Sequence, residues 1–316
     1  MARLVRPALR ETRTRVFDSA RWQGYKARPD DIIVATYAKC GTTWTQRIVS
    51  MLIFGSADPR PVWDLSPWPD ARFGPPIDAV YALAEAQPHR RFFKSHLPLD
   101  ALPLYEDVKY VHVARDGRDA CMSLHNHLCN FTPDARAMLS EISVNDPKFG
   151  DPYPPTPEDA GAFFHDWVTH DDERQGDPSA SFFHVERSFW EERQRPNVLL
   201  VHYADLKAAR EDEMRRIAAF LDIEIPEALW PELVDAASFE SMKRDGEALI
   251  PFAHALWEGG PNRFLNKGTN GRWRDCFAPE DLARYQAKVE AEVSPALARW
   301  IEHGRRGAGD PRTLPD

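Results

Sequence analysis

The feature that most constrains this chain is an apolar run that meets a short polar loop and then a helical pattern. Residues 31–37 have strand length, the loop carries Lys39 and Gly41, and a helix-period pattern begins at Thr42. A strand, a tight loop and a helix start are how a parallel α/β sheet presents backbone N–H groups to a phosphate. Gly41 lets the backbone approach an anion, and Lys39 adds a mobile positive charge. An ordinary strand-to-helix turn with a solvated lysine would look the same, so the rest of the chain decides.

Length and charge restrict the class of protein. The chain has 316 residues, 43% of them hydrophobic, and a formal net charge of −9. We expect one domain over residues 1–316, because there is neither a clean linker nor an internal repeat. The acidic balance argues against nucleic acid and against an anionic membrane surface as partners, although it allows a local basic pocket.

The four cysteines predict reduced thiols and no metal site. Cys40, Cys121, Cys129 and Cys276 form no CxxC pair and have no zinc-type spacing with histidine. Cys40 is the exception to watch, because a position beside a bound anion and a helix N-terminus tends to lower a thiol pKa.

The N-terminal segment is rich in arginine and shows no secretory signal. Residues 1–16 hold five arginines but no apolar h-region, which indicates a frayed basic helix or part of a targeting segment rather than a secretory signal. No apolar run reaches the roughly 18 residues that a membrane span needs. We therefore expect a cytoplasmic protein with no membrane span, an arm over 1–30 that packs on the core, and a disordered tail over 304–316.

Short apolar strands alternate with helical patterns along the chain, which predicts an α/β fold. The expected fold is a central parallel β-sheet of four to five strands flanked by helices. Two proline-rich stretches, 57–78 and 131–161, are expected to be a long surface loop and a lid, and 245–272 shows little periodicity. Strands are expected at 31–37, 90–96, 109–114 and 197–202, and helices at 42–54, 77–87, 135–142, 160–170, 181–194, 206–221, 226–236 and 279–302, with one more ending near 129.

Charged side chains follow three of the expected strands, at Lys39, at Lys94 with His96, and at Arg115. Ligands of parallel sheets lie at the carboxyl ends of the strands, so these side chains are predicted to meet. Lys94 and His96 are two residues apart and point to the same side. His96 could accept a proton from a substrate hydroxyl while Lys94 holds an anion. Alternatively, His96 is a satisfied histidine at a strand end.

Two more segments could hold an anion. Arg115 could fork onto a phosphate, or pair with Asp116 or Asp119 on the surface. Residues 264–273 are basic and contain glycine, which fits either a second anion-binding nest or a solvated loop. The loop at Lys39 lacks GxxxxGK[ST], and no carboxylate set for Mg²⁺ stands at a strand end. An ordinary nucleotide kinase or NTPase is therefore disfavoured.

Four segments, in this order, resemble the cytosolic sulfotransferases that use 3′-phosphoadenosine 5′-phosphosulfate (PAPS). Residues 37–44, YAKCGTTW, are similar to the family's 5′-phosphosulfate loop YPKSGTTW, and residues 93–98, FKSHLP, to its K-[ST]-H-L-P strand. Residues 113–123 resemble its 3′-phosphate segment, and residues 266–273 its late RKGxxGDW segment. One such motif is weak, but four in family order are specific, and together they span residues 31–277.

The resemblance implies a P-loop-like three-layer sandwich and a role for each matched residue. His96 would be the general base, and Lys39 and Lys94 would stabilise the leaving group. PAPS would be the donor and PAP the product, with no metal. The donor site would comprise Lys39, Cys40, Gly41, Thr42, Thr43, Trp44, Arg115, Ser123, Asn266, Lys267 and Gly268, with Tyr203 and Phe239 beside the adenine.

The chain also departs from the family pattern. Cys40 stands where the family's loop has serine, and Asn266 where it has the arginine before Lys267; Arg263 or Arg272 could compensate. The family's C-terminal dimer motif is not evident, so an oligomer is possible but not predicted.

The predicted function is in-line transfer of sulfonate to a hydroxyl of a small, apolar or aromatic acceptor. The predicted acceptor class is based on aromatic residues of the proline-rich loops, which are expected to contact the acceptor. Alternatively, these aromatic residues only pack the loops themselves. The rival hypotheses are a non-catalytic PAP-binding protein and a nucleotide-dependent kinase. The aromatic residues are Trp63, Trp68, Phe73, Phe131, Phe149 and Tyr153.

Overall fold

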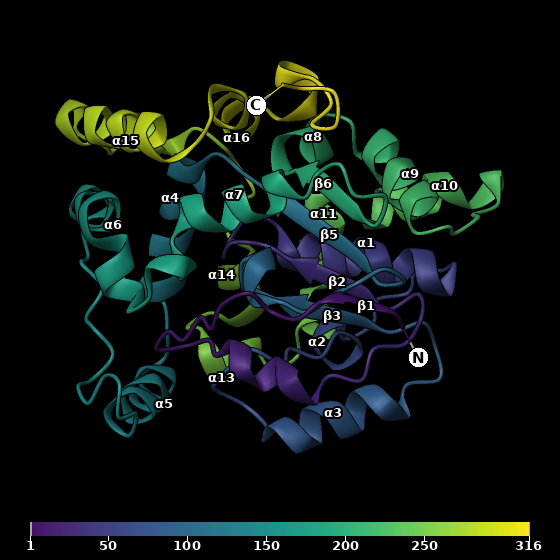
Figure 1. The fold of residues 1–316 in the computed structure, drawn as a ribbon, viewed down its shortest axis with the longest axis horizontal. Coiled ribbons are helices and arrows are strands. Elements are labelled where there is room, and N and C mark those ends of the chain that lie inside the picture. The colour runs from purple at the N-terminus through teal and green to yellow at the C-terminus, as the bar shows by residue number, and fades with distance from the viewer. Residues whose placement is uncertain (1, 316) are drawn as a thin grey trace.

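The computed structural model of the chain describes residues 2–315, apart from the side chains of 172–175. At its centre lies a four-stranded parallel sheet in the order β3-β2-β5-β6 (Figure 1). This confirms the predicted α/β class with a parallel sheet flanked by helices. The strands are β2 (Ile32–Ala35), β3 (Phe92–Ser95), β5 (Lys109–Ala114) and β6 (Val198–His202).

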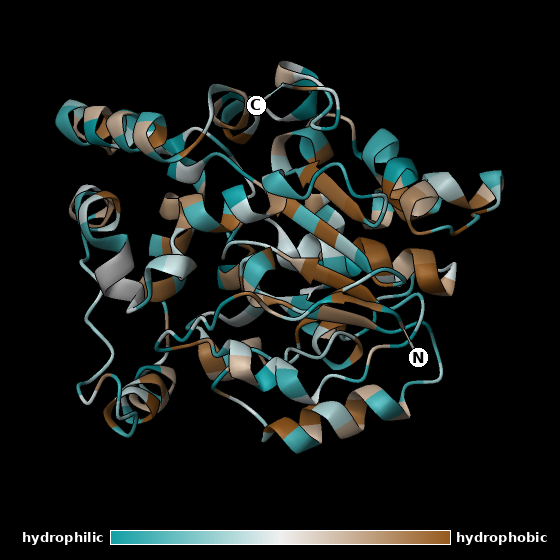
Figure 2. Ribbon diagram, viewed as in Figure 1, coloured by the Kyte–Doolittle hydropathy of each residue, from teal (hydrophilic) through white to brown (hydrophobic). Residues whose placement is uncertain are grey.

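Side-chain alternation along β2 divides the core into two layers. Ile33 and Ala35 belong to a cluster with helices α4 (Gly117–Cys129) and α7 (Phe182–Glu191). Ile32 and Val34 belong to a second cluster, with α1 (Thr42–Phe54) and α9 (Arg210–Phe220). All four β2 side chains are fully buried, as expected where helices cover both faces of a parallel sheet. Figure 2 shows the strands and α1 largely in the hydrophobic colour, whereas the outer helices are mixed.

Helices begin directly after three of the strands and so carry residues to one edge of the sheet. α1 follows β2, α4 follows β5, and α8 (Tyr203–Ala208) follows β6. The remaining helices are α2 (Val62–Leu65), α3 (Ile77–Ala86), α5 (Pro133–Val144), α6 (Ala160–Gln175), α10 (Trp230–Ala236), α11 (Phe239–Arg244), α12 (Gly246–Leu249), α13 (Ala253–Leu256), α14 (Gly260–Leu265), α15 (Pro279–Glu292) and α16 (Pro295–Ala308). None of the helices in the described part of the chain combines the length and apolar character that a bilayer crossing requires.

The two ends of the chain differ from the sequence prediction. The arginine-rich start is not a helix, because β1 (Leu4–Arg6) pairs antiparallel with β4 (Leu104–Tyr105). The tail is not disordered over 304–315, because α16 runs to Ala308 and the following residues pack on the chain. Buried Arg193 donates to the carbonyl oxygens of Pro311 and Leu314.

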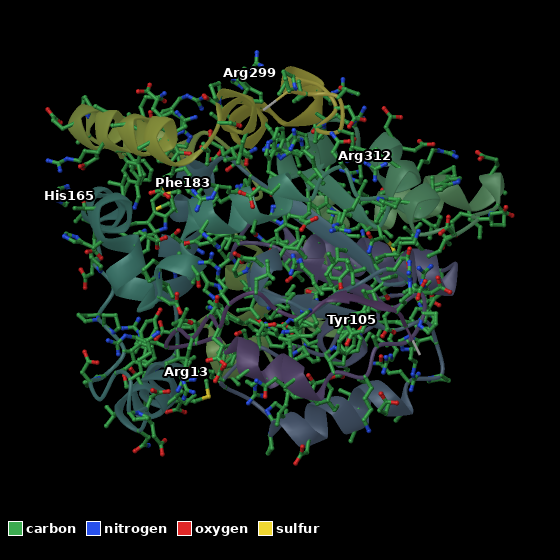
Figure 3. All side chains as sticks on the ribbon, viewed as in Figure 1. Arg13, Tyr105, His165, Phe183, Arg299 and Arg312 are labelled. Atoms are coloured by element: carbon green, nitrogen blue, oxygen red, sulfur yellow. The ribbon has the colours of Figure 1, made fainter. Side chains whose placement is uncertain are left out.

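Arg312, labelled in Figure 3, holds the same tail against the edge of the sheet. Its guanidinium donates to the carbonyl oxygens of Arg195 and Val198. Contacts from arginine to main-chain carbonyls leave no hydrophobic period in the sequence, so the pattern gave no sign of order there.

Candidate active site

The loop between β2 and α1 forms what we call the anion cradle, residues 39–43. Lys39 and Gly41 both have positive φ, 69° and 114°. For a lysine this conformation costs about 1–2 kcal/mol, and such strain is typical of functional loops. No side chain caps α1, and the N–H groups of Thr42 and Thr43 have no acceptor among the described residues. The cradle therefore offers unpaired N–H donors at a helix N-terminus, which is a site for an anion.

Tyr203, at the start of α8, lies beside the cradle. A Cβ at Gly41 would be 3.1 Å from its ring, so the close approach depends on glycine. The ring of Trp44 meets Tyr203 edge to face with centroids 5.4 Å apart, and the Arg115 guanidinium lies 4.1 Å from the Tyr203 ring centroid. The Trp44 indole N–H donates to the carbonyl of Ala237 at 2.8 Å, just before α11. The structure thus brings together four of the predicted donor-site residues, Gly41, Trp44, Arg115 and Tyr203.

The late glycine-bearing segment lies against the same site. Arg115 donates to the side-chain oxygen of Asn270 at 2.8 Å and to the carbonyl of Lys39 at 3.0 Å. It therefore links the cradle to the late segment instead of forming only a surface pair. Gly268 has φ 63°, and a Cβ there would lie 2.5 Å from the ring of Phe239, so Phe239 packs on the bare backbone of this segment.

Two arginines hold unpaired donors in this region. The Nε atoms of Arg115 and Arg272 are buried and have no hydrogen-bond partner in the described part of the chain. An unpaired buried donor costs about 1–3 kcal/mol, which a bound anion would recover. Burial raises the pKa of Tyr203. The positive charges of Arg115 and Arg272 act in the opposite direction, and the effect of Arg115 is the larger of the two. The charge of Arg272 therefore lies near enough to Tyr203 to act on its pKa.

The other predicted donor-site residues lie around this centre. Ser123, on α4, is half-buried, and its hydroxyl has no hydrogen-bond partner among the described residues. Lys267 is exposed, and the carbonyl of Asn266 accepts from Lys243 at 3.5 Å, so these two lie at the rim. The Thr42 hydroxyl lies 2.6 Å from that of Thr36, a contact that the sequence did not indicate.

Cys40 does not have the low thiol pKa that its position suggested. Its side chain is fully buried in the core cluster with β2 and α4, and burial raises its thiol pKa well above the ordinary value. The prediction of a lowered pKa was wrong because the sulfur faces apolar side chains instead of the helix N-terminus. Only the backbone of Cys40 belongs to the cradle. The described part of the chain contains no disulfide bond.

Lys39 is half-buried and Lys94 is buried, and the pKa of each is lowered. Burial lowers the pKa of Lys39 to about 7, with Arg115 adding to the effect. Burial also lowers the pKa of Lys94 to about 7; there Asp70 opposes the shift and Lys39 adds to it. The Lys94 ammonium lies 3.4 Å from the ring centroid of Trp68. Two neighbouring lysines with lowered pKa values are typical of a site that receives negative charge.

His96 follows β3 and is fixed by contacts on both sides. Its Nδ1 lies 2.8 Å from the carbonyl oxygen of Thr36, and its backbone N–H donates to Asp70 at 3.0 Å. Because a carbonyl can only accept, Nδ1 carries the proton and Nε2 keeps a free lone pair. Burial, with help from Lys94, lowers the pKa of His96 well below its usual value. The imidazole is therefore neutral and can accept a proton at Nε2.

Two residues of the site escaped the sequence analysis. Asp70, fully buried, accepts from the indole N–H groups of Trp22 and Trp68 besides His96, and a proline-rich loop gave no pattern to find it. His127 lies with its Nδ1 3.3 Å from the Lys39 ammonium. It is four residues after Ser123 on α4, and that spacing could have identified it as a neighbour on the same helix face.

Aromatic rings flank the lysines on two sides. The His96 wall consists of Phe17, Trp68 and Phe73, whose rings lie within 5.6 Å of His96 or of one another. The His127 wall consists of Phe131, Trp257 and Phe264, with centroids 4.8–5.9 Å from His127.

Some aromatic residues of the proline-rich loops lie in or against these walls, and Phe149 packs elsewhere. Trp63 contacts the His127 wall, 6.0 Å from Trp257, whereas Phe149 packs on Arg15 and Arg72 instead. Among the described residues, no three His, Cys, Asp or Glu side chains are grouped as metal ligands.

The sheet carries an anion cradle with Lys39 after β2, and Lys94 lies near the end of the neighbouring strand β3. This arrangement defines a protein that binds an anionic ligand at the edge of a parallel sheet. Comparisons with known proteins narrow this class. Residues 29–297 match the family model of the sulfotransferase domain. A glycolipid sulfotransferase of Mycobacterium bovis (strain BCG / Pasteur 1173P2) is 33% identical over 318 residues, 93% of this chain and 94% of the relative. The chain belongs to the sulfotransferase family and is a sulfotransferase enzyme.

Solved structures show the same fold. Retinol dehydratase in a complex with retinol and PAP matches with a TM-score of 0.68 at 23% identity, covering 88% of this chain and 85% of that chain. Retinol dehydratase in complex with androsterone and inactive cofactor PAP matches with a TM-score of 0.69 at 22% identity, covering 91% of each chain. The predicted P-loop-like fold is confirmed.

Proposed function

We propose that this enzyme transfers the sulfonate group of PAPS to a hydroxyl of an apolar or aromatic acceptor. The observation that carries the proposal is His96, which holds its proton on Nδ1 and stands beside two lysines of lowered pKa and the anion cradle. PAPS supplies the sulfonate group and leaves as PAP.

The cradle is the proposed site of the 5′-phosphosulfate. The free N–H groups of Thr42 and Thr43 would bind its oxygens, and Gly41 allows the approach. The 3′-phosphate would satisfy the unpaired Nε atoms of Arg115 and Arg272, with the Ser123 hydroxyl and the 266–268 segment as further contacts. Adenine would lie with Trp44, Tyr203 and Phe239, because Tyr203 borders Gly41 and Trp44, and Phe239 packs on Gly268. The structural neighbours named above contain PAP, which supports this assignment.

His96 is the proposed general base. Its Nε2 takes the proton of the acceptor hydroxyl while the hydroxyl oxygen bonds to sulfur and the bond from sulfur to the phosphate oxygen breaks. Lys39 and Lys94 stabilise the negative charge that grows on the departing phosphate, and burial strengthens both interactions. Charge that is stabilised more in the transition state than in the ground state accelerates the step.

The two aromatic walls favour an apolar acceptor. They line the His96 and His127 sides of the lysines with rings and leave few polar side chains to bind a hydrophilic substrate. Retinol and androsterone, named in the structural neighbours, are apolar alcohols, and the mycobacterial relative is named for a glycolipid. We therefore propose an alcohol or phenol with a largely apolar body.

A ligand panel separates this proposal from its rivals. PAP, ATP with Mg²⁺, and NAD are compared by the rise in Tm, and PAPS is then offered with a set of phenols and apolar alcohols. The proposal predicts that PAP stabilises the enzyme most and that sulfonate appears on an acceptor. Stronger stabilisation by ATP with Mg²⁺ would support a kinase. PAP binding without transfer to any acceptor would support a non-catalytic binding protein. His96→Ala is the control that should bind PAP and lose transfer.

A further inference from the structure

His127 places an imidazole directly against Lys39 of the proposed reaction centre. Its Nδ1 lies 3.3 Å from the Lys39 Nζ, and the Phe264 ring centroid lies 4.2 Å from the same Nζ. The lysine ammonium is thus held between a hydrogen-bond acceptor and an aromatic face. His127 comes from α4, the helix that also carries Ser123 of the proposed donor site.

We infer that His127 is a positioning residue, which directs Lys39 for sulfonate transfer by accepting a hydrogen bond from its ammonium group. The inference rests on the proposed function, since it assigns a partner to a lysine of that reaction. His127 acts through Lys39 and is not itself the base.

The hydrogen-bond roles of this pair follow from the chemistry of the two groups. A lysine ammonium has only donors, so the Nδ1 of His127 must accept and its Nε2 must carry the proton. Nδ1 is also the one hydrogen-bond acceptor that the described residues offer to the Lys39 Nζ. Loss of the imidazole would leave a half-buried ammonium without an acceptor from the described residues, which is costly.

Packing fixes the imidazole in the orientation that this hydrogen bond needs. Its ring centroid lies 4.8 Å from Trp257 and 5.2 Å from Phe131. The Trp257 indole N–H also donates to the His127 carbonyl at 3.2 Å, which anchors this turn of α4. A ring held by neighbours on several sides is preorganised, and so is the lysine that it binds.

The surrounding charges keep His127 able to accept. Burial lowers its pKa well below the usual value, and Lys39, Lys94 and His96 lower it further. The titratable groups that face it are therefore all cationic or basic, and none of them favours a protonated His127. The neutral ring is the form that can accept from Lys39.

Two substitutions at this position separate the hydrogen bond from the packing. His127→Phe keeps an aromatic ring and removes the acceptor, whereas His127→Asn places a side-chain oxygen close to the position of Nδ1. We expect His127→Phe to lower kcat about 10- to 100-fold, the usual effect of one charge-assisted hydrogen bond, and His127→Asn to recover most of that loss. The KM for PAPS and the Kd for PAP should change much less than kcat, because among the described residues Lys39 is the one donor contact that depends on His127.

A second readout does not depend on activity. Competitive labelling of lysines with acetic anhydride at several pH values, read by mass spectrometry, follows the titration of Lys39. His127→Phe should lower the apparent pKa of Lys39, because the ammonium loses its acceptor, and His127→Asn should restore it in part. Unchanged kcat and unchanged Lys39 labelling in His127→Phe would overturn the inference. If His127→Phe failed to fold, His127→Gln would replace it, since its longer side chain carries the acceptor away from Nδ1.

The outcomes also separate this inference from the proposed function. If the wild-type enzyme moved no sulfonate from PAPS, the proposed function would fail, and the positioning role would fail with it. The labelling would then still report whether His127 binds Lys39. If transfer occurred but His127→Phe altered neither kcat nor labelling, only the positioning role would be wrong.

Discussion

His96 donates its Nδ1–H to the carbonyl oxygen of Thr36 over 2.8 Å. The register of the sheet explains this pairing, because Ala35 of β2 lies opposite Ser95 of β3 and the next residues, Thr36 and His96, follow in step. The strand register therefore selects the tautomer of the proposed base, with Nε2 left to accept a proton.

Replacement of His96 by alanine should lower kcat at least about 100-fold and leave the Kd for PAP within about threefold, since general-base catalysis typically contributes that much. Steady-state rates with PAPS and equilibrium titration with PAP measure the two quantities. A His96→Ala enzyme that kept its full rate with saturating acceptor would show that another group takes the proton.

The pH profile tests the same residue. A base must be deprotonated to act, and burial with Lys94 holds the pKa of His96 well below 6.5. We therefore expect no fall in kcat that titrates near pH 6.5 as the pH is lowered; the loss due to His96 should begin only at lower pH. An acidic limb with an apparent pKa near 6.5 would contradict the buried, neutral imidazole.

Donor binding should take up protons at Lys39 and Lys94. Both have a pKa of about 7 without ligand, and a bound anion favours the charged form of each. The affinity for PAP should therefore decrease as the pH rises from 7 to 9, by at most about 10-fold per pH unit for each lysine. Calorimetry at pH 8 in buffers of different ionisation enthalpy measures the uptake. Lys39→Met and Lys94→Met should each reduce the uptake, whereas the exposed Lys26→Met should not.

The contact between Gly268 and Phe239 can be tested by comparing alanine substitutions at Gly268 and at Gly74. Gly268 and Gly74 both have positive φ, 63° and 90°, so alanine is strained at either position by about 1 kcal/mol. A Cβ at Gly268 would lie 2.5 Å from the Phe239 ring, whereas a Cβ at Gly74 would meet nothing within 4 Å. Gly268→Ala should therefore weaken PAP binding about 10-fold, and Gly74→Ala should leave it unchanged. Equal PAP affinities for the two variants would remove Phe239 from the proposed donor site.

Local patterns in the sequence predicted the parts of the site that are local in the fold. The strand before Lys39, the glycine turn and the helix start at Thr42 are neighbours along the chain, so their arrangement follows from periodicity and turn chemistry. The same holds for the helix that begins after Arg115.

Contacts between distant segments were not predictable in this way. Lys39 contacts His127, which lies 88 positions further along the sequence, and Arg115 contacts Asn270, which lies 155 positions further along. Both contacts depend on how separate helices and loops pack. The direction of the Cys40 side chain also depends on tertiary packing, which is why its thiol pKa was mispredicted.

Asp146 ties the segment after α5 to the N-terminal arm. Its side chain is fully buried and pairs with both Arg13 and Arg72, which come from the arm and from the proline-rich loop (Figure 3 labels Arg13). Burial raises its pKa, but the hydrogen bond from Arg13 and the charge of Arg72 outweigh this, and the net pKa is lowered. The stabilisation is therefore complete above the ordinary aspartate pKa and is lost as the pH falls through the lower folded value.

Asp146→Asn should reduce the free energy of unfolding at pH 7 by about 1–3 kcal/mol, because two arginines lose their charged partner. The difference from wild type should shrink as the pH is lowered from 5 to 3, since the wild-type carboxylate is then protonated. Urea unfolding across this pH range measures both effects. Glu141→Gln, an exposed change on α5, is the control and should alter stability by no more than about 0.5 kcal/mol at either pH. A difference between Asp146→Asn and wild type that stayed constant down to pH 3 would show that the ion pairs do not fasten this segment.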